Sequence, residues 1–268
     1  MNQAKSKTTL HVAAVQYDIQ WLDKPANLTT LEALIRGFHH ENDAVDLMLL
    51  PETFSSGFCI EDNAVKEPED GGDVLIWLQG MAAAFNCVVA GTVFVQQGGK
   101  KANRFYWVRP DGSVEYYDKR HLFRLGNEGD FVSQGKARKV LEINGIRILP
   151  QVCYDLRFPV WSRNRQDYDV LVNVANWPAA RRNVWDTLLQ ARAMENQVFV
   201  VGVNRVGDDG KGVAHSGGTC VLDFVGTPLV AAEDNRQQVI RAELDFSALE
   251  RFKTDFPAYL DADDFELA

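Results

Sequence analysis

The sequence has no long hydrophobic run and no cluster of basic residues, and these absences exclude several classes of protein. No apolar stretch of this 268-residue chain approaches the roughly 20 residues that a helix needs to cross a bilayer. The net charge is −9 and the lysines and arginines are dispersed, whereas nucleic acids and anionic membranes bind a basic face. We therefore expect neither nucleic acid nor membrane as a partner.

Cysteine is scarce, and no pair of cysteines has the spacing of a metal site. Cys59, Cys87, Cys153 and Cys220 form no CxxC pair, which argues against a zinc ribbon. The opening MNQAKSKTTLHVAAVQ lacks the apolar core of a signal peptide, and we expect residues 1–8 to be a frayed tail. Four cysteines without an export signal predict reduced thiols in the cytoplasm.

Apolar runs of strand length alternate with segments of helical spacing. Residues 24–38 repeat leucine, isoleucine and phenylalanine three and four apart, as an amphipathic helix does. Helices are also predicted at residues 73–86, 181–196 and 245–252. Strands are predicted at residues 11–16, 46–51, 87–95, 105–110, 113–118, 145–152, 169–176, 198–204 and 218–224, and at PLVAA and QVIRAEL near the end.

This alternation predicts a layered α/β fold. No linker rich in glycine or serine divides the chain, so we expect one domain over residues 1–268. The turn PDGS at 110–113 predicts a hairpin between its flanking strands. The two halves repeat a strand–helix–strand–helix–strand pattern, and two such units stacked face to face would place two sheets inside and helices outside.

Three chemically reactive side chains each follow a predicted strand. Glu52 follows DLMLLP, Lys119 follows SVEYYD, and Cys153 follows GIRILPQV. Ligand sites in α/β sheets form at the carboxyl ends of strands. Taken singly, each residue also has a structural interpretation, because buried cysteines pack as small apolar residues and loop charges are usually solvated. The other three cysteines are interpreted in this structural way.

Together the three residues would suffice for acyl transfer through a thioester. The carboxylate can accept the thiol proton as a general base, and the ammonium can favour the thiolate and stabilise an oxyanion. The protonated carboxyl can then protonate a departing amine and later activate a water molecule. No metal or other cofactor is needed.

The segments LLPETFSSGF, YYDKRHLF and QVCYDLRFP resemble the three signature segments of the nitrilase (carbon–nitrogen hydrolase) superfamily. The resemblance extends to VANWPAARR, ARAMENQVFVVGVNRVG and HSGGTCVLDFVG, and so covers nearly the whole chain. It implies a four-layer α-β-β-α sandwich. It also implies Glu52 as base, Lys119 as oxyanion stabiliser and Cys153 as nucleophile.

The resemblance assigns further roles. Glu128, in LGNEGDFV, matches a position that supports the lysine and helps to orient the substrate. The backbone N–H of Tyr154, next to the nucleophile, is expected to be the second oxyanion donor. The sandwiches of this family commonly pair through the face near the cysteine, and LRFPVWSRNRQ at 156–166 mixes apolar and polar residues, so we expect a homodimer or higher homo-oligomer.

Within the superfamily the sequence looks most like the ω-amidase branch, whose members act on amides such as 2-oxoglutaramate and 2-oxosuccinamate. A guanidinium binds a carboxylate through two parallel hydrogen bonds, and Arg157 is the candidate clamp, with a structural ion pair as its other interpretation. Arg181 and Arg182 are weaker candidates because a helix start there would leave at least one in solvent. Trp177 is a candidate pocket wall or a core residue.

Three alternatives remain open from the sequence. The first alternative keeps the chemistry but changes the substrate to another aliphatic amide or an N-carbamoyl amine. The ω-amidase-like segments disfavour a nitrile substrate. The second alternative is a Cys–His hydrolase that uses His121, two residues after Lys119. The third is a binding protein that keeps the sandwich without activity, although such scaffolds usually lose part of the trio and all three positions are filled here.

Overall fold

The computed structural model describes residues 8–41 and 45–266 as two six-stranded sheets with helices on their outer faces. The first sheet has the order β14-β1-β2-β3-β4-β5 and the second β13-β12-β9-β8-β7-β6. The first contains β1 (Thr9–Gln16), β2 (Leu47–Leu49), β3 (Val88–Gln97), β4 (Lys100–Val108), β5 (Val114–Asp118) and β14 (Gln238–Asp245). The second contains β6 (Leu141–Ile143), β7 (Ile146–Val152), β8 (Val170–Ala175), β9 (Phe199–Asn204), β12 (Cys220–Leu222) and β13 (Pro228–Ala231).

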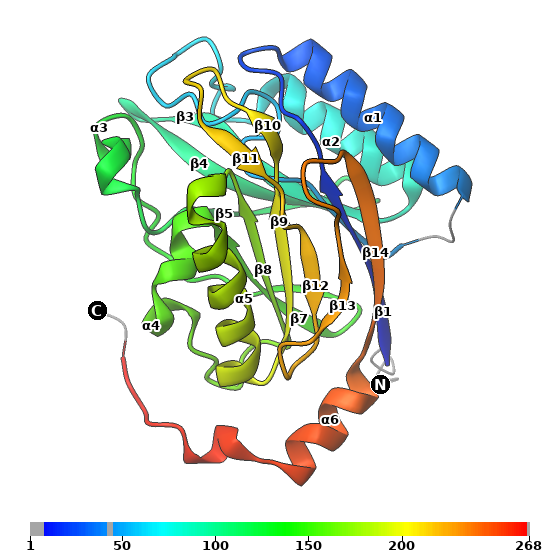
Figure 1. Ribbon diagram of the computed structural model, residues 1–268. Coiled ribbons are helices and arrows are strands. Elements are labelled where there is room, and N and C mark those ends of the chain that lie inside the picture. The colour runs from blue at the N-terminus through cyan, green and yellow to red at the C-terminus, as the bar shows by residue number, and fades with distance from the viewer. Residues whose placement is uncertain (1–7, 42–44, 267–268) are drawn as a thin grey trace.

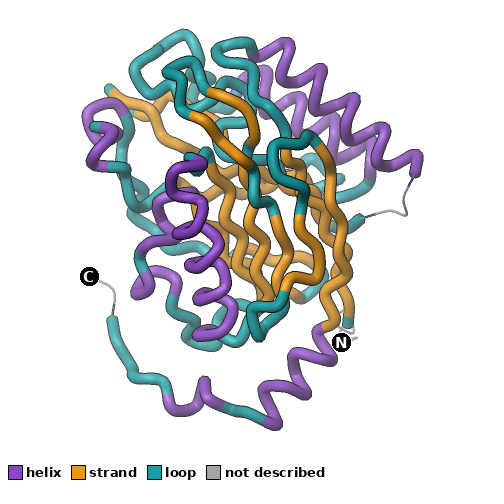
Figure 2. The backbone as a smooth tube through the Cα atoms, in the orientation of Figure 1, coloured by secondary structure: helices purple, strands orange, loops and turns teal. Residues whose placement is uncertain are grey.

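Helices cover the sheets from outside, as Figures 1 and 2 show. The α-helices are α1 (Lys24–Glu41), α2 (Gly72–Phe85), α3 (Glu128–Phe131), α4 (Pro159–Ser162), α5 (Arg182–Asn196) and α6 (Phe246–Asp255). The 3-10 helices are η1 (Arg124–Gly126), η2 (Cys153–Arg157), η3 (Ala179–Arg181) and η4 (Ala258–Asp261). A separate hairpin pairs β10 (Val206–Asp208) with β11 (Ala214–Ser216). The four-layer α-β-β-α prediction is confirmed.

The alternation of buried residues along the strands explains the layers. In β1, Val12 and Ala14 contribute to the apolar cluster between the two sheets, whereas Ala13 and Val15 contribute to the cluster beneath α1 and α2. A third cluster lies between the second sheet and α5. Because successive side chains of a strand point to opposite faces, strands covered on both faces are apolar at most positions. This accounts for the unbroken apolar runs in the sequence.

The internal repeat appears as two sets of parallel strands. β1, β2 and β3 are parallel neighbours in one sheet, and β7, β8 and β9 are parallel neighbours in the other. The second repeat differs from the prediction in one respect, because only the short η2 and α4 lie between β7 and β8. The hairpin predicted at PDGS joins β4 to β5, with Gly112 at a φ of 82°.

The first and last strands of the chain, β1 and β14, lie side by side at one edge of the first sheet. β14 pairs antiparallel with β1 along eight positions, and α6 then begins an arm that runs beneath the second sheet (Figure 1). The predicted frayed tail lies outside the described residues except for Thr8. Within the described ranges, no helix is long and apolar enough to span a bilayer.

Candidate active site

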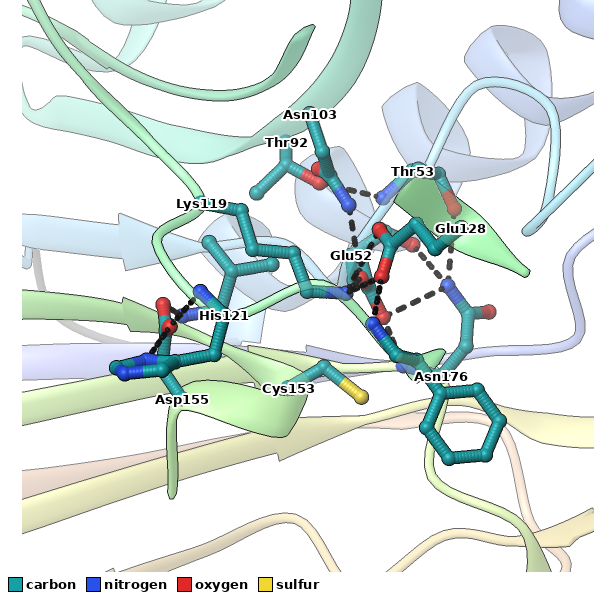
Figure 3. Close-up of polar contacts among 12 residues, drawn as sticks. Glu52, Thr53, Thr92, Asn103, Lys119, His121, Glu128, Cys153, Asp155 and Asn176 are labelled. Carbon is teal, nitrogen blue, oxygen red and sulfur yellow. Dashed lines mark hydrogen bonds and ion pairs between the residues drawn. The ribbon is translucent and has the colours of Figure 1, made fainter. Parts of the chain in front are cut away.

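The three predicted residues lie together between the ends of strands from both sheets. Glu52 follows β2 and Lys119 follows β5 in the first sheet, whereas Cys153 follows β7 in the second. Cys153 adopts a φ of 47°, a left-handed backbone conformation that is unusual for a non-glycine residue and is found at functional sites. This turn directs the side chain towards Glu52, Lys119 and Glu128 (Figure 3).

Glu52 is completely buried, and polar partners hold both of its carboxylate oxygens. Oε1 accepts hydrogen bonds from Asn103 Nδ2 at 2.8 Å and Lys119 Nζ at 3.1 Å. Oε2 accepts one from the backbone N–H of Asn176 at 2.8 Å. The Asn176 side chain also donates to the Glu52 carbonyl oxygen and to Thr53 Oγ1. The carboxylate is therefore fixed in orientation before any substrate arrives.

Lys119 is buried between two carboxylates. Its ammonium lies 3.0 Å from both Glu128 oxygens as well as 3.1 Å from Glu52, and the Phe58 ring covers it at 5.1 Å. Burial disfavours the charged amine, but the Glu128 and Glu52 carboxylates outweigh it and raise the pKa of Lys119. A permanent cation therefore stands beside the cysteine.

Glu128 is held by the protein on both oxygens. It accepts the two bonds from Lys119 and one from the backbone N–H of Phe123 at 2.6 Å. Burial raises its pKa, and the Lys119 ammonium opposes that shift. The position of Glu128 therefore fits the lysine-supporting role that the resemblance implies.

The thiol of Cys153 is held in its protonated form. Burial, followed by the nearby Glu52 carboxylate, raises the pKa of Cys153 well above its usual range, and the Lys119 ammonium offsets this only in part. The Lys119 ammonium does favour the thiolate, as expected, but burial and the Glu52 carboxylate outweigh it. A thiol next to a carboxylate requires that the proton move to that carboxylate as sulfur attacks.

A third buried carboxylate, Asp155, joins the turn after β5 to the turn after β7. Its oxygens accept hydrogen bonds from the backbone N–H groups of Val152 and His121, from His121 Nδ1 and from the Tyr117 hydroxyl, at 2.8–3.0 Å. His121 also stacks on Phe158 at 3.8 Å and lies with Asp155 away from the sulfur (Figure 3). This orientation disfavours the Cys–His alternative.

A cavity of about 300 Å³ opens onto the sulfur, a size suited to a small ligand. Tyr154, Arg157 and Trp177 all line it, as do the three central residues. Trp177 is both a pocket wall and a core residue, because it is buried and its ring packs 5.4 Å from Trp185. Arg181, a weaker candidate of the sequence analysis, also lines the cavity.

Arg182 does not line the cavity. It pairs with Asp186 and Asp234 at 2.6–3.0 Å. We expected the helix start to leave at least one of the two adjacent arginines in solvent, and Arg182 instead lies in two ion pairs with its side chain 26% exposed. The 3-10 turn η3 ends at Arg181 and presents that side chain to the cavity instead.

Sequence reasoning missed the residues that hold the trio in place. Asn176 follows β8 directly, so the rule that selected Glu52, Lys119 and Cys153 could also have selected it. Asn103 is a fully buried amide in β4, but its sequence neighbours include lysines and an arginine, so no local signal distinguished it. Among the described residues, no group of three His, Cys, Asp or Glu side chains is placed to hold a metal ion.

Comparisons with known proteins agree with the geometry of the site. The family model described as carbon-nitrogen hydrolase matches residues 11–254. The omega-amidase YafV of Yersinia enterocolitica is 44% identical over 262 residues, covering 97% of this chain and 99% of the relative. The 2-oxoglutaramate amidase of Bacillus subtilis is 31% identical, covering 93% of this chain and 96% of that protein.

A solved structure agrees closely with the model. A carbon–nitrogen hydrolase superfamily protein from Xanthomonas campestris, whose crystal structure has an arsenic adduct in the active site, superposes with a TM-score of 0.92. It is 40% identical and the match covers 98% of this chain and 100% of that one. The similarity therefore extends over the entire fold.

Proposed function

The chain belongs to the carbon–nitrogen hydrolase family, and from that premise we propose that it is an ω-amidase. It hydrolyses small carboxylate-bearing amides of the 2-oxoglutaramate or 2-oxosuccinamate type to the acid and ammonia. The observation that carries this proposal is the convergence of the Glu52 carboxylate, the Lys119 ammonium and the Cys153 thiol at a small cavity. The relatives named ω-amidase and 2-oxoglutaramate amidase support the substrate class.

The acylation step begins with transfer of the Cys153 proton to Glu52 as sulfur attacks the amide carbon. The oxyanion that forms is stabilised by the Lys119 ammonium and the backbone N–H of Tyr154, which are present before the reaction. When the tetrahedral intermediate collapses, Glu52 returns the proton to the amide nitrogen and the C–N bond breaks. Ammonia leaves, and the acyl group remains on sulfur as a thioester.

Deacylation uses the same proton transfers, with water in place of the thiol as the nucleophile. Glu52 accepts a proton from water as the oxygen attacks the thioester carbon, and the same oxyanion donors act again. The C–S bond then breaks, the acid leaves, and Cys153 recovers its proton from Glu52. The two oxygens of Glu52 are fixed by Asn103, Lys119 and Asn176, so one orientation serves both steps.

Arg157 and Trp177 form the proposed wall for the rest of the substrate. The Arg157 guanidinium lies 5.1 Å from the Trp177 ring and 6.0 Å from that of Tyr154. A guanidinium between rings keeps its charge available to a carboxylate. This arrangement favours an acidic amide over a neutral aliphatic one. An N-carbamoyl amino acid also carries a carboxylate, so the preference for an amide over that class rests on the names of the relatives.

The test is ammonia release from succinamate, 2-oxoglutaramate and N-carbamoyl-β-alanine by the wild type and by Cys153→Ala. We expect turnover of the first two compounds, and loss of at least about 1,000-fold in the variant because no nucleophile remains. Cys220→Ala is the matched control, since Cys220 lies in β12 away from the cavity. Equal rates for wild type and Cys153→Ala would overturn the proposal, and preference for the carbamoyl compound would replace its substrate.

We also propose that this single domain forms a homo-oligomer in the cytoplasm. The four cysteines are free, which supports a reducing compartment. Val160 on α4 is 57% exposed, and Phe256 and Leu260 on the C-terminal arm are 61% and 64% exposed, which supports contact with a second copy near the cysteine. A monomer at micromolar concentration in sedimentation would contradict the oligomer.

A further inference from the structure

The cavity wall carries more positive charge than the proposed reaction uses. Besides Lys119, the cations that line it are Arg157, Arg181 and Lys211. Lys211 is neutralised by Glu61 at 2.6 Å. Arg157 and Arg181 form no ion pair with any carboxylate in the described part of the chain, although most other arginines there do. Two unpaired guanidinium groups therefore share one small cavity.

Aromatic rings and backbone bonds, rather than carboxylates, hold these two arginines. The Arg181 guanidinium lies over the Phe123 ring at 5.5 Å, and Arg157 lies between Tyr154 and Trp177. The Trp177 indole N–H donates to the Arg181 carbonyl oxygen at 2.8 Å, which fixes η3 against the cavity wall. Cation–π contacts position a charge without cancelling it.

The other ionisable groups at the cavity offset this charge only in part, because Asp209 is one carboxylate against two guanidiniums. The Asp209 carboxylate accepts the backbone N–H groups of Lys211 and Val213 within its own turn. Burial, followed by the charge of Arg205, lowers the pKa of His215 to about 4, so His215 is neutral at neutral pH. The Glu52 and Glu128 carboxylates form ion pairs with the Lys119 ammonium. The wall that faces the substrate's remote end is therefore cationic.

We propose that Arg181 is a specificity-determining residue that binds the substrate carboxylate together with Arg157, and that this pair excludes amides bearing an ammonium group beside that carboxylate. The inference rests on the proposed function and deepens it. Two guanidiniums from different elements, η2 and η3, fix a carboxylate at two points. An α-ammonium beside the bound carboxylate would lie next to these two like charges, so asparagine and glutamine are rejected while their deaminated and 2-oxo counterparts are accepted.

The experiment compares three amides that differ at one group. Succinamate carries the carboxylate, levulinamide replaces it with a neutral methyl ketone of similar shape, and asparagine adds an α-ammonium to succinamate. Arg181→Gln is measured beside Arg182→Gln, a matched control from the next residue, whose side chain pairs with Asp186 and Asp234 instead of lining the cavity. The readout is kcat/KM from ammonia release, with thermal unfolding to confirm that each variant is folded.

We expect Arg181→Gln to lower kcat/KM for succinamate about 10- to 100-fold, the usual loss for a charge-assisted hydrogen bond, and to change levulinamide less than about threefold. The preference for succinamate over asparagine should fall at least about tenfold, while Arg182→Gln leaves all three values near those of the wild type. Equal losses on succinamate and levulinamide, or an unchanged preference against asparagine, would overturn the inference. Wild-type inactivity on every amide would instead defeat the proposed function.

Discussion

At the scale of single residues, the protonation state of Cys153 separates this site from one built around a resting thiolate. Burial and then Glu52 raise the pKa of the thiol, and Lys119 compensates only in part. Glu52 therefore has two opposite effects. It accepts the proton that makes sulfur nucleophilic, and its charge keeps that proton on sulfur until a substrate is present.

Replacing Glu52 with glutamine should separate these two effects. Glu52→Gln removes the carboxylate that raises the pKa of the thiol and leaves the Lys119 ammonium beside it, so the pKa of Cys153 should fall. At the same time no base remains, and amidase activity should fall by about 100- to 10,000-fold. The measurement is the pH dependence of Cys153 alkylation by iodoacetamide, read by mass spectrometry.

We expect the alkylation midpoint of Glu52→Gln to lie at lower pH than that of the wild type, because a lower pKa gives more thiolate at a given pH. Glu61→Gln, which removes an exposed carboxylate paired with Lys211, is the control and should keep the wild-type midpoint. A midpoint that moves to higher pH in Glu52→Gln would show that the carboxylate does not raise the pKa of the thiol.

At the scale of elements, Asp155 is the residue that connects the strand ends on which Lys119 and Cys153 lie. It receives hydrogen bonds from Tyr117 and His121, which flank Lys119 in the sequence, and from Val152, which precedes the cysteine. Its carboxylate touches none of the reacting groups, so it is a positioning residue. The turn after β5 and the turn after β7 belong to different sheets, and Asp155 sets their separation.

Asp155→Asn should reduce kcat about 100-fold with KM within about twofold, because displacement of about 1 Å at a catalytic group has that effect. The free energy of unfolding should also fall by about 3 kcal/mol, since a buried carboxylate loses charge-assisted bonds. Steady-state kinetics and urea unfolding measure the two effects. Asp223→Asn changes a carboxylate that also accepts two backbone N–H groups but lies outside the cavity lining, and its kcat should not change.

An Asp155→Asn variant with normal kcat and reduced stability would show a merely structural role. A parallel rise in KM would instead place Asp155 in substrate binding, which its position behind the cysteine turn does not support.

Most of the longer elements were predictable from the sequence, whereas some of the shortest ones were not. The 24–38 segment became α1, and the 145–152 segment became β7, because local periodicity and tertiary burial agree there. The hairpin of β10 and β11 was not predicted, since strands of three residues with polar members owe their conformation to contacts with the rest of the protein.

The same distinction applies to the site. Glu52, Lys119 and Cys153 could be selected from their positions after strands, whereas the Asn176 contact to Glu52 joins residues 124 apart in sequence. Arg181 was ranked low because spacing alone does not reveal that η3 ends there and turns its side chain to the cavity. Local periodicity predicts neither long-range contacts nor the direction in which a single turn points a side chain.

At the scale of the whole molecule, a buried neutral histidine makes the fold sensitive to acid. Burial, followed by the charge of Arg205, lowers the pKa of His215 to about 4 from its usual value near 6.5. A lowered pKa means that the unfolded chain binds this proton first, so the stabilisation is present above pH 6.5 and is lost as the pH falls towards 4. His215 should contribute about 3 kcal/mol to this loss.

His215→Gln should therefore remove part of the acid sensitivity. Urea unfolding of wild type and variant at pH 7.5, 5.5 and 4.5 measures the effect, and the slope of unfolding free energy against pH should be smaller in the variant. His40→Gln, on an exposed face of α1, should keep the wild-type slope. Identical slopes for wild type and His215→Gln would contradict the assignment.

Neither sheet alone carries all three catalytic groups, so activity depends on how much of the chain has been synthesised. The proton acceptor and the cation come from the first half of the chain, and the sulfur from the second. The edge strand β14, which pairs with β1, ends only at Asp245. A nascent chain on the ribosome therefore exposes no working amidase, and ammonia release should begin only after translation has passed the last strand and both halves have docked.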